Sequence, residues 1–121
     1  MFSAAYKIAK DSTFERHKLG AVLCRGGRIL AVGFNSIRYT KELGHSTLHA
    51  EESVILKLLK SRRQHLLVGA ELYVTRVRPN GTCGLSRPCD RCMSLIKAVG
   101  IKKVHYTTDN GTETINVKND T

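Results

Sequence analysis

Two short stretches of the sequence carry residues that could bind a metal ion and act through it. In "STLHAEESV", His49 precedes Glu51 by two residues, and in "SRPCDRC", Cys89 precedes Cys92 by three. Positions three apart share one face of a helix, so both thiolates can contact one ion at about 2.3 Å. His49 adds a third ligand of a type that zinc accepts beside two thiolates.

The glutamate gives this ligand set a chemical use. Three protein ligands leave one tetrahedral position for water, which is typical of a catalytic zinc site, and zinc makes such water acidic enough to act as a nucleophile. Glu51 is too close to His49 in sequence to be an obvious fourth ligand, and it could take the proton from that water. Taken alone, Glu51 could simply be an acidic residue in a first helical turn.

The cysteines allow two other interpretations. A CxxC pair can be a redox dithiol, but the preceding strand of a thioredoxin-like unit is missing here. Cys83 could join His49, Cys89 and Cys92 in a closed Cys3His site, which would be a structural-zinc module without a position for water. That alternative leaves Glu51 without a role.

The elements that must position these residues form an alternating helix and strand pattern. Apolar residues at helical spacing predict helices, and β-rich apolar runs bounded by turn residues predict strands. We expect the following order: a helix over 2–10, a hairpin over 19–35, a polar loop over 36–48, a helix over 49–61, a strand over 71–77, a helix from 89 to a stop at Gly100, a strand over 102–107 and a strand over 112–118.

Turn chemistry and apolar continuity predict how these strands assemble. Gly26-Gly27 suits the tight turn of the hairpin, and both of its strands are nearly continuously apolar, which predicts cover on both faces. The segment between the last two strands has no room for a crossover helix, so the fifth strand should run antiparallel to the fourth. The expected fold class is α/β, a mixed five-stranded sheet covered by helices.

Size and charge set the outer limits. The 121 residues predict one domain, 1–121, and no apolar run approaches the roughly 18 residues of a membrane span. Lys7, Lys10 and Asp11 lie where a secretory signal needs an apolar core, so we expect a cytoplasmic protein with reduced thiols. The net charge of +10 favours anionic partners, namely nucleotides, nucleic acid or an acidic protein, and also fits a basic surface without specific function.

The two motifs together resemble those of the zinc-dependent cytidine/deoxycytidylate deaminase superfamily, whose signature is H-x-E followed by P-C-x-x-C. The resemblance implies a three-layer cytidine-deaminase-like fold, with Zn2+ held by His49, Cys89 and Cys92 and protons carried by Glu51. It also implies that the backbone of Ala50 holds a pyrimidine ring, and that the protein forms a homo-oligomer. Asn35 matches an asparagine that many relatives place against the sugar, although it could equally be a polar cap at the end of a strand.

The chain departs from the superfamily pattern in the segment between the third strand and the Pro-Cys motif, which is long here. This segment should border the site, and its Arg76, Arg78 and Arg87 could contact a phosphate. Alternatively, "RPNG" is a hairpin turn with solvated arginines. An antiparallel fifth strand resembles the branch acting on free nucleosides, whereas His49 resembles the branches acting on deoxycytidylate, transfer-RNA adenosine and polynucleotides.

The sequence therefore predicts a zinc-dependent hydrolytic deaminase that converts cytosine to uracil in a pyrimidine nucleoside or nucleotide, such as cytidine, CMP or dCMP, and releases ammonia. One alternative is deamination of a base in tRNA or single-stranded DNA, for which the net charge is the main cue. The other is the non-catalytic Cys3His module.

Overall fold

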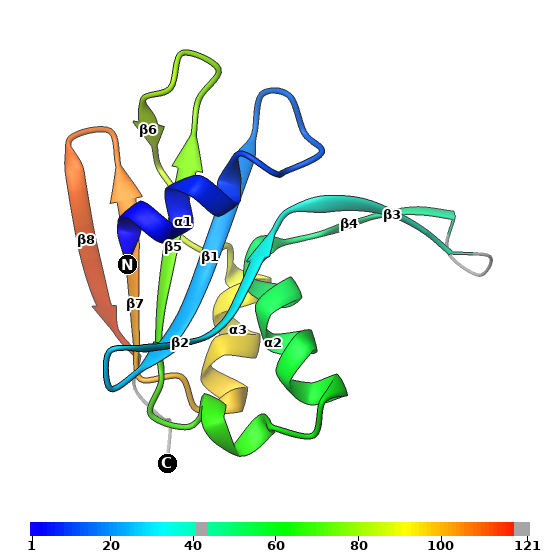
Figure 1. Ribbon diagram of the computed structural model, residues 1–121, viewed down its shortest axis with the longest axis vertical. Coiled ribbons are helices and arrows are strands. Elements are labelled where there is room, and N and C mark those ends of the chain that lie inside the picture. The colour runs from blue at the N-terminus through cyan, green and yellow to red at the C-terminus, as the bar shows by residue number, and fades with distance from the viewer. Residues whose placement is uncertain (41–43, 118–121) are drawn as a thin grey trace.

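The computed structural model describes residues 1–40 and 44–117 and shows a central sheet with helices on both faces (Figure 1). The described elements are α1 (Phe2–Ala9), β1 (Lys18–Arg25), β2 (Arg28–Phe34), β3 (Ser36–Thr40), β4 (Gly44–Leu48), α2 (Ala50–Lys60), the 3-10 helix η1 (Gln64–Leu67), β5 (Glu71–Val77), β6 (Cys83–Gly84), α3 (Asp90–Val99), β7 (Lys103–Thr108) and β8 (Gly111–Asn116). None of these helices is long and apolar enough to cross a membrane.

The main sheet has the strand order β2-β1-β5-β7-β8, and the short strand β6 pairs with β5 outside this path. β5 and β7 run parallel, whereas β1 is antiparallel to both of its neighbours and β8 is antiparallel to β7. Helix α1 covers one face, and α2 and α3 cover the other (Figure 1). The predicted mixed sheet, its helical layers and its antiparallel fifth strand are confirmed.

The core lies between the sheet and the pair α2 and α3. Val54 and Leu58, one turn apart on α2, are fully buried, as are Leu72 and Val74 on β5 and Ile96 on α3. This arrangement follows from the apolar stripe of α2, which must be buried against the sheet. On the other face, α1 approaches so closely that a Cβ at Gly20 would lie 2.2 Å from the Ala5 carbonyl oxygen. Only glycine fits there.

Two expectations about strands need correction. Both strands of the hairpin were expected to be covered on both faces. This is correct for β1, but β2 is an edge strand and its Ile29 is 47% exposed. The prediction of a polar loop over 36–48 is wrong. In this segment β3 and β4 pair with each other, with Ser36 opposite Leu48 and Ile37 opposite Thr47. This two-stranded arm extends away from the main sheet (Figure 1), and its Ile37 is 53% exposed. Residues 41–43 lie outside the described part.

The long segment before the Pro-Cys motif folds back on β5. The Arg78 N–H donates to the Thr82 carbonyl at 2.8 Å, and the Gly81 N–H donates to the Arg78 carbonyl at 2.9 Å, which closes a turn. Beyond it, β6 pairs with β5, with Val77 opposite Cys83. The expected turn at "RPNG" is therefore present, and whether the neighbouring arginines contact a phosphate stays a prediction. This hairpin directs the chain towards the start of α3.

A candidate metal centre and its cavity

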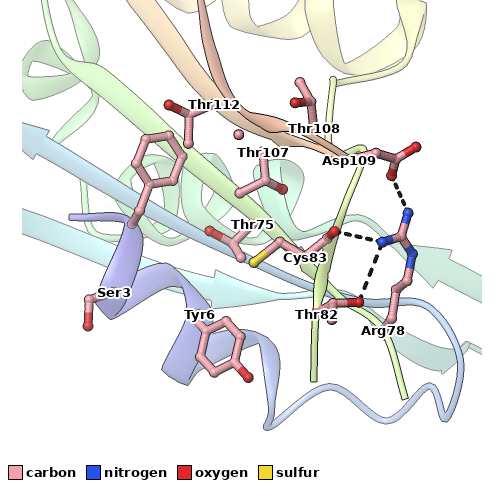
Figure 2. A pocket seen from close by; sticks show the side chains of 12 residues that line it. Ser3, Tyr6, Thr75, Arg78, Thr82, Cys83, Thr107, Thr108, Asp109 and Thr112 are labelled. Carbon is pink, nitrogen blue, oxygen red and sulfur yellow. Dashed lines mark hydrogen bonds and ion pairs between the residues drawn. The ribbon is translucent and has the colours of Figure 1, made fainter. Parts of the chain in front are cut away.

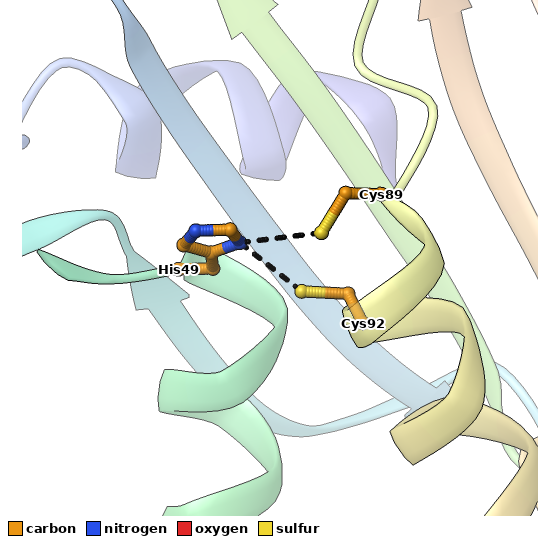
Figure 3. Close-up of side chains that lie close together, drawn as sticks. All are labelled: His49, Cys89 and Cys92. Carbon is orange, nitrogen blue, oxygen red and sulfur yellow. Dashed lines mark hydrogen bonds between the residues drawn. The ribbon is translucent and has the colours of Figure 1, made fainter.

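The three predicted ligands meet where α2 and α3 begin. His49 is the N-cap residue of α2, Cys89 is the N-cap residue of α3, and Cys92 lies in the first turn of α3. Their side chains point toward one another (Figure 3): His49 Nδ1 lies 3.2 Å from Cys92 Sγ and 3.8 Å from Cys89 Sγ. All three ligand atoms lie within 4.8 Å of one another.

These distances and donor types fit zinc. With the bond lengths usual for zinc, tetrahedral geometry places a nitrogen and a sulfur ligand about 3.6 Å apart and two sulfur ligands about 3.8 Å apart. Burial raises the pKa of the Cys92 thiol, so without metal this side chain keeps its proton, and binding a cation would release it. Three ligands from the described residues leave one tetrahedral position open.

Glu52 holds the two helix starts together. Its Oε1 accepts a hydrogen bond from the His49 backbone N–H at 3.0 Å and pairs with Arg91 Nη2 at 2.9 Å. Glu52 therefore fixes the N-cap of α2 and links it to the first turn of α3. The sequence interpretation missed this role, although an acidic residue three positions after an N-cap is the spacing of a capping box.

Glu51 follows the ligand His49 by two residues, and it is buried, with 4% of its surface exposed. Its pKa is raised to about 7, mainly by burial. A backbone hydrogen bond opposes this rise, and the charge of Glu52 adds to it. Together with His49 and Cys89, it lines a cavity of about 320 Å³. A carboxyl group in this setting can hold or release a proton near neutral pH.

The cavity gathers several of the predicted substrate contacts. Asn35, Arg76 and Arg87 line it, and Ala50 is fully buried between the lining residues His49 and Glu51. Arg78 does not line it: that side chain pairs with Asp109 on the other side of the sheet. Further lining residues, which the sequence interpretation did not single out, are Phe14, His17, Leu19, Thr47, Leu85 and Ser86.

Asn35 is tied to the segment that connects α1 to β1. Its Oδ1 accepts hydrogen bonds from the Leu19 N–H at 2.9 Å and from the Ser12 hydroxyl, and its Nδ2 donates to the His17 carbonyl at 2.6 Å. The side chain is 5% exposed. Asn35 therefore shapes the cavity wall by holding this segment, and one N–H of its amide remains for a ligand. A contact with the sugar stays a prediction.

A buried pair of hydroxyls positions the chain that leads to Cys89. The Ser86 hydroxyl donates to the Val74 carbonyl at 2.7 Å and accepts from the Thr107 N–H at 2.7 Å, so it bridges β5 and β7 where their direct pairing ends. The Thr107 hydroxyl donates to the Gly84 carbonyl at 2.6 Å and accepts from the Arg76 N–H at 3.2 Å. This bridge fixes the segment that carries Leu85 and Arg87, two further residues that line the cavity.

Cys83 does not join the metal centre. Among the residues that the structure describes, the group that could hold a metal comprises His49, Cys89 and Cys92. Cys83 instead lines a different cavity together with residues of α1. The Cys3His module therefore lacks its fourth ligand.

Known proteins are similar to this chain in sequence and in fold. Residues 1–108 match the family described as "Cytidine and deoxycytidylate deaminase zinc-binding region". The chain is 35% identical over 88 residues to a tRNA-specific adenosine deaminase of Agrobacterium fabrum, a match that covers 73% of this chain and 49% of that protein. The chain thus spans about half the length of that relative.

Solved structures agree with this assignment. The dCMP deaminase of cyanophage S-TIM5 in its apo form is 30% identical, with a TM-score of 0.67 over 88% of this chain and 79% of that chain. The cytidine deaminase of Burkholderia pseudomallei is 19% identical and shares the fold, with a TM-score of 0.71 over 96% of this chain and 89% of that chain. The protein therefore belongs to the cytidine and deoxycytidylate deaminase family of zinc-binding proteins.

Proposed function

We propose that this deaminase converts cytosine to uracil in a pyrimidine nucleoside monophosphate. The observation that carries the proposal is one cavity that joins a zinc-type ligand set, a buried carboxyl group and two arginines, Arg76 and Arg87. In the reaction, the oxygen of water replaces the amino group at C4 of the ring, and that group leaves as ammonia. A second crystal structure of the cyanophage dCMP deaminase, to which this chain is 27% identical, contains dCMP and dUMP.

Glu51 is proposed to manage the protons. Zinc, when bound, supplies the Lewis acidity that allows water to ionise near neutral pH. Among the described residues that line the cavity, Glu51 is the one carboxyl group, and it lies beside His49 and Cys89. It can therefore accept a proton from the attacking water and return protons to the ring nitrogen and to the departing amine.

The remaining walls are proposed to hold the substrate. Phe14, Leu19 and Leu85 supply apolar surface against which a pyrimidine ring can lie while water is excluded. Arg76 and Arg87 provide guanidinium groups for a phosphate. The Nη2 of Arg76 lies 3.0 Å from His17 Nδ1, and the buried Nε of Arg76 has no hydrogen-bond partner within residues 1–40 and 44–117. An anion that reached this side chain could satisfy such a donor.

A second candidate is deamination of a base within tRNA or single-stranded DNA. The identity to a tRNA-specific adenosine deaminase favours it, as does the net charge of +10. A polynucleotide substrate would require several phosphate contacts, and its binding would weaken steeply with salt. A single nucleotide makes fewer such contacts and would show a shallower salt dependence.

The test is ammonia release from the zinc-loaded protein with cytidine, deoxycytidine, CMP and dCMP, with Glu51→Gln as the control. We expect release from a monophosphate, faster than from its nucleoside, and at least a hundredfold loss in the variant at unchanged zinc content. If none of the four compounds releases ammonia while tRNA or single-stranded DNA does, the second candidate would replace the proposal. Full activity of Glu51→Gln would refute the role of this carboxyl group.

A further inference from the structure

The larger of the two cavities described here lies away from the metal centre, on the face of the sheet that α1 covers. It has a volume of about 620 Å³, and its walls come from α1, the β5–β6 hairpin and the turn between β7 and β8 (Figure 2). Neighbouring residues of β5 separate the two cavities: Thr75 lines this one and Arg76 lines the other. Successive side chains of a strand point to opposite faces of the sheet, so the two cavities have different walls.

Aromatic and methyl groups form much of the wall. Phe2 and Tyr6 lie one turn apart on α1, so they share one side of the helix. Threonines of β5, β7 and β8 line the same cavity (Figure 2). Both rings are held in place. The Tyr6 hydroxyl donates to the Gly81 carbonyl at 2.9 Å, and the Phe2 ring packs edge-on against Tyr73 with 5.1 Å between ring centroids. Fixed rings of this kind favour a flat apolar ligand.

The charges at this cavity cancel. Among its described lining residues, the cation is Arg78 and the anion is Asp109, and these two side chains form an ion pair. Arg78 Nη1 also donates to the Cys83 carbonyl at 2.8 Å (Figure 2). The guanidinium is therefore already committed to partners within the chain, which disfavours a phosphate or a carboxylate as the ligand.

One buried hydroxyl lacks a partner. Thr75 is 1% exposed, and its Oγ1 makes no hydrogen bond to any residue that the structure describes. The neighbouring Thr107 hydroxyl, by contrast, donates to the Gly84 carbonyl and accepts from the Arg76 N–H. A buried hydroxyl without a partner costs free energy, and a ligand group that reached it would recover that cost.

We propose that this cavity binds a neutral, planar heterocycle of one or two rings, with a hydrogen-bonding group directed at the Thr75 hydroxyl. The volume lies within the range of small-molecule sites. The rings of Phe2 and Tyr6 supply contact area for the ligand. The ion pair of Arg78 and Asp109 disfavours a charged ligand, and the hydroxyl of Thr75 orients the ligand by a hydrogen bond. This site is separate from the proposed deaminase site and does not rest on the proposed function.

Cys83 provides a local reporter for the test. Its thiol lines the cavity and is partly exposed, whereas Cys24 and Cys92 are buried and Cys89 belongs to the metal centre. Iodoacetamide labelling of the zinc-loaded protein, read at the Cys83 peptide by mass spectrometry, therefore measures access to the cavity. The probes are nicotinamide, which is neutral, and nicotinate, which has the same ring and one negative charge.

We expect nicotinamide to slow labelling of Cys83 with an apparent Kd of about 1 mM, the affinity typical of a ligand of this size. Nicotinate should protect at least about tenfold more weakly, because a charge would lose its hydration without gaining a partner. Thr75→Val should raise the Kd for nicotinamide by about tenfold. This variant is expected to fold, because it replaces an unpaired buried hydroxyl by a methyl group of the same shape.

Three results would overturn the proposal. The first is no protection by nicotinamide up to about 20 mM, well above the expected Kd, which would mean a cavity that holds only water. The second is equal protection by nicotinamide and nicotinate, and the third is equal protection in the wild type and in Thr75→Val. Circular dichroism and the zinc content of Thr75→Val confirm that the comparison is made on folded protein.

Discussion

The two cavities differ in size and in chemistry, and the smaller one is the proposed deaminase site. The cavity at the metal centre, of about 320 Å³, contains a buried carboxyl group, two arginines and metal ligands. The cavity on the α1 face is about twice as large, at about 620 Å³, and its charges are paired with each other. Volume therefore does not identify the reactive site. Unneutralised charge and metal-binding side chains do.

Helix orientation explains this difference. Both α2 and α3 begin at the metal centre, and the N-terminus of a helix presents free N–H groups and partial positive charge. Such an end favours thiolates and anions, including a substrate phosphate. Helix α1 instead presents the side of its first turns, with Phe2 and Tyr6, to the other cavity. The face with the metal centre is thereby suited to charged ligands, and the face covered by α1 is suited to neutral ligands.

The largest expected effect comes from exchanging one sulfur for oxygen, once at the metal centre and once at the α1-face cavity. Cys92→Ser removes a buried zinc ligand, and we expect it to lose the metal and all deaminase activity, because serine is a poor ligand for zinc. Cys83→Ser makes the same chemical change at the other cavity and should keep both. Zinc content by atomic absorption and ammonia release measure the two outcomes. Loss of zinc from Cys83→Ser would revive the Cys3His alternative.

A second pair of variants separates the arginines. Arg87→Met removes a guanidinium from the metal-centre cavity, and we expect KM for a nucleoside monophosphate to rise about 10- to 100-fold, while that for the nucleoside stays unchanged. Arg78→Met makes the same change at the α1-face cavity, where the side chain pairs with Asp109. It should change neither KM. Steady-state kinetics with dCMP and deoxycytidine test this, and equal effects of both variants would remove the contrast between the cavities.

The hydroxyl bridge gives a smaller effect that concerns position rather than charge. Thr107→Val leaves the Gly84 carbonyl and the Arg76 N–H without their partner, so the segment that leads to Cys89 should lose its fixed path. We expect kcat/KM to fall about tenfold and the free energy of unfolding to fall by about 1–3 kcal/mol, with zinc retained.

Thr107→Ser keeps the hydroxyl and is the matched control. Restored kcat/KM in Thr107→Ser, measured beside urea unfolding of both variants, would assign the effect to the hydrogen bonds. A loss of kcat/KM as large in Thr107→Ser as in Thr107→Val would assign it to packing instead.

The metal centre was predictable because its signals are local. His49, Cys89 and Cys92 sit where helical periodicity begins, and two helix starts covering the same sheet can bring such residues together. The antiparallel β8 was predictable for a similar reason, since the short segment at 109–110 leaves no room for a crossover.

The supporting contacts were not predictable, because they join residues that are distant in sequence. The Ser86 and Thr107 hydroxyls meet only through the register of β5, β6 and β7, and Arg91 reaches Glu52 only after α2 and α3 have packed. Short polar side chains carry no periodic signal of such pairing. The same limit placed Arg78 with Arg76 and Arg87 in the sequence interpretation, although the hairpin turn carries it to the opposite face.

The smallest expected effect lies on the α1 face and concerns pH. His105 Nε2 lies 2.8 Å from Glu71 Oε1, and this hydrogen bond, with the charges of His105, Lys103 and Lys102, lowers the pKa of Glu71. A carboxyl group with a lowered pKa in the folded state adds stability above its unfolded pKa of about 4.3, and this stability disappears as the pH falls through the folded value.

Glu71→Gln should therefore lower the free energy of unfolding at pH 6 by less than about 1 kcal/mol, because the side chain of Glu71 is 35% exposed and solvent screens the pair. The gap between wild type and variant should shrink as the pH falls below the unfolded pKa of about 4.3, and it should close once the pH lies below the lowered pKa of the folded state, where the carboxyl group is protonated in both states. Urea unfolding of both proteins at each pH measures this gap, and the shared loss of zinc in acid cancels in the comparison. A gap of equal size at pH 3 and pH 6 would mean that Glu71 stabilises this face by packing or neutral hydrogen bonding. The contrast between an ionic face and a neutral face would then hold for the whole α1 side of the sheet.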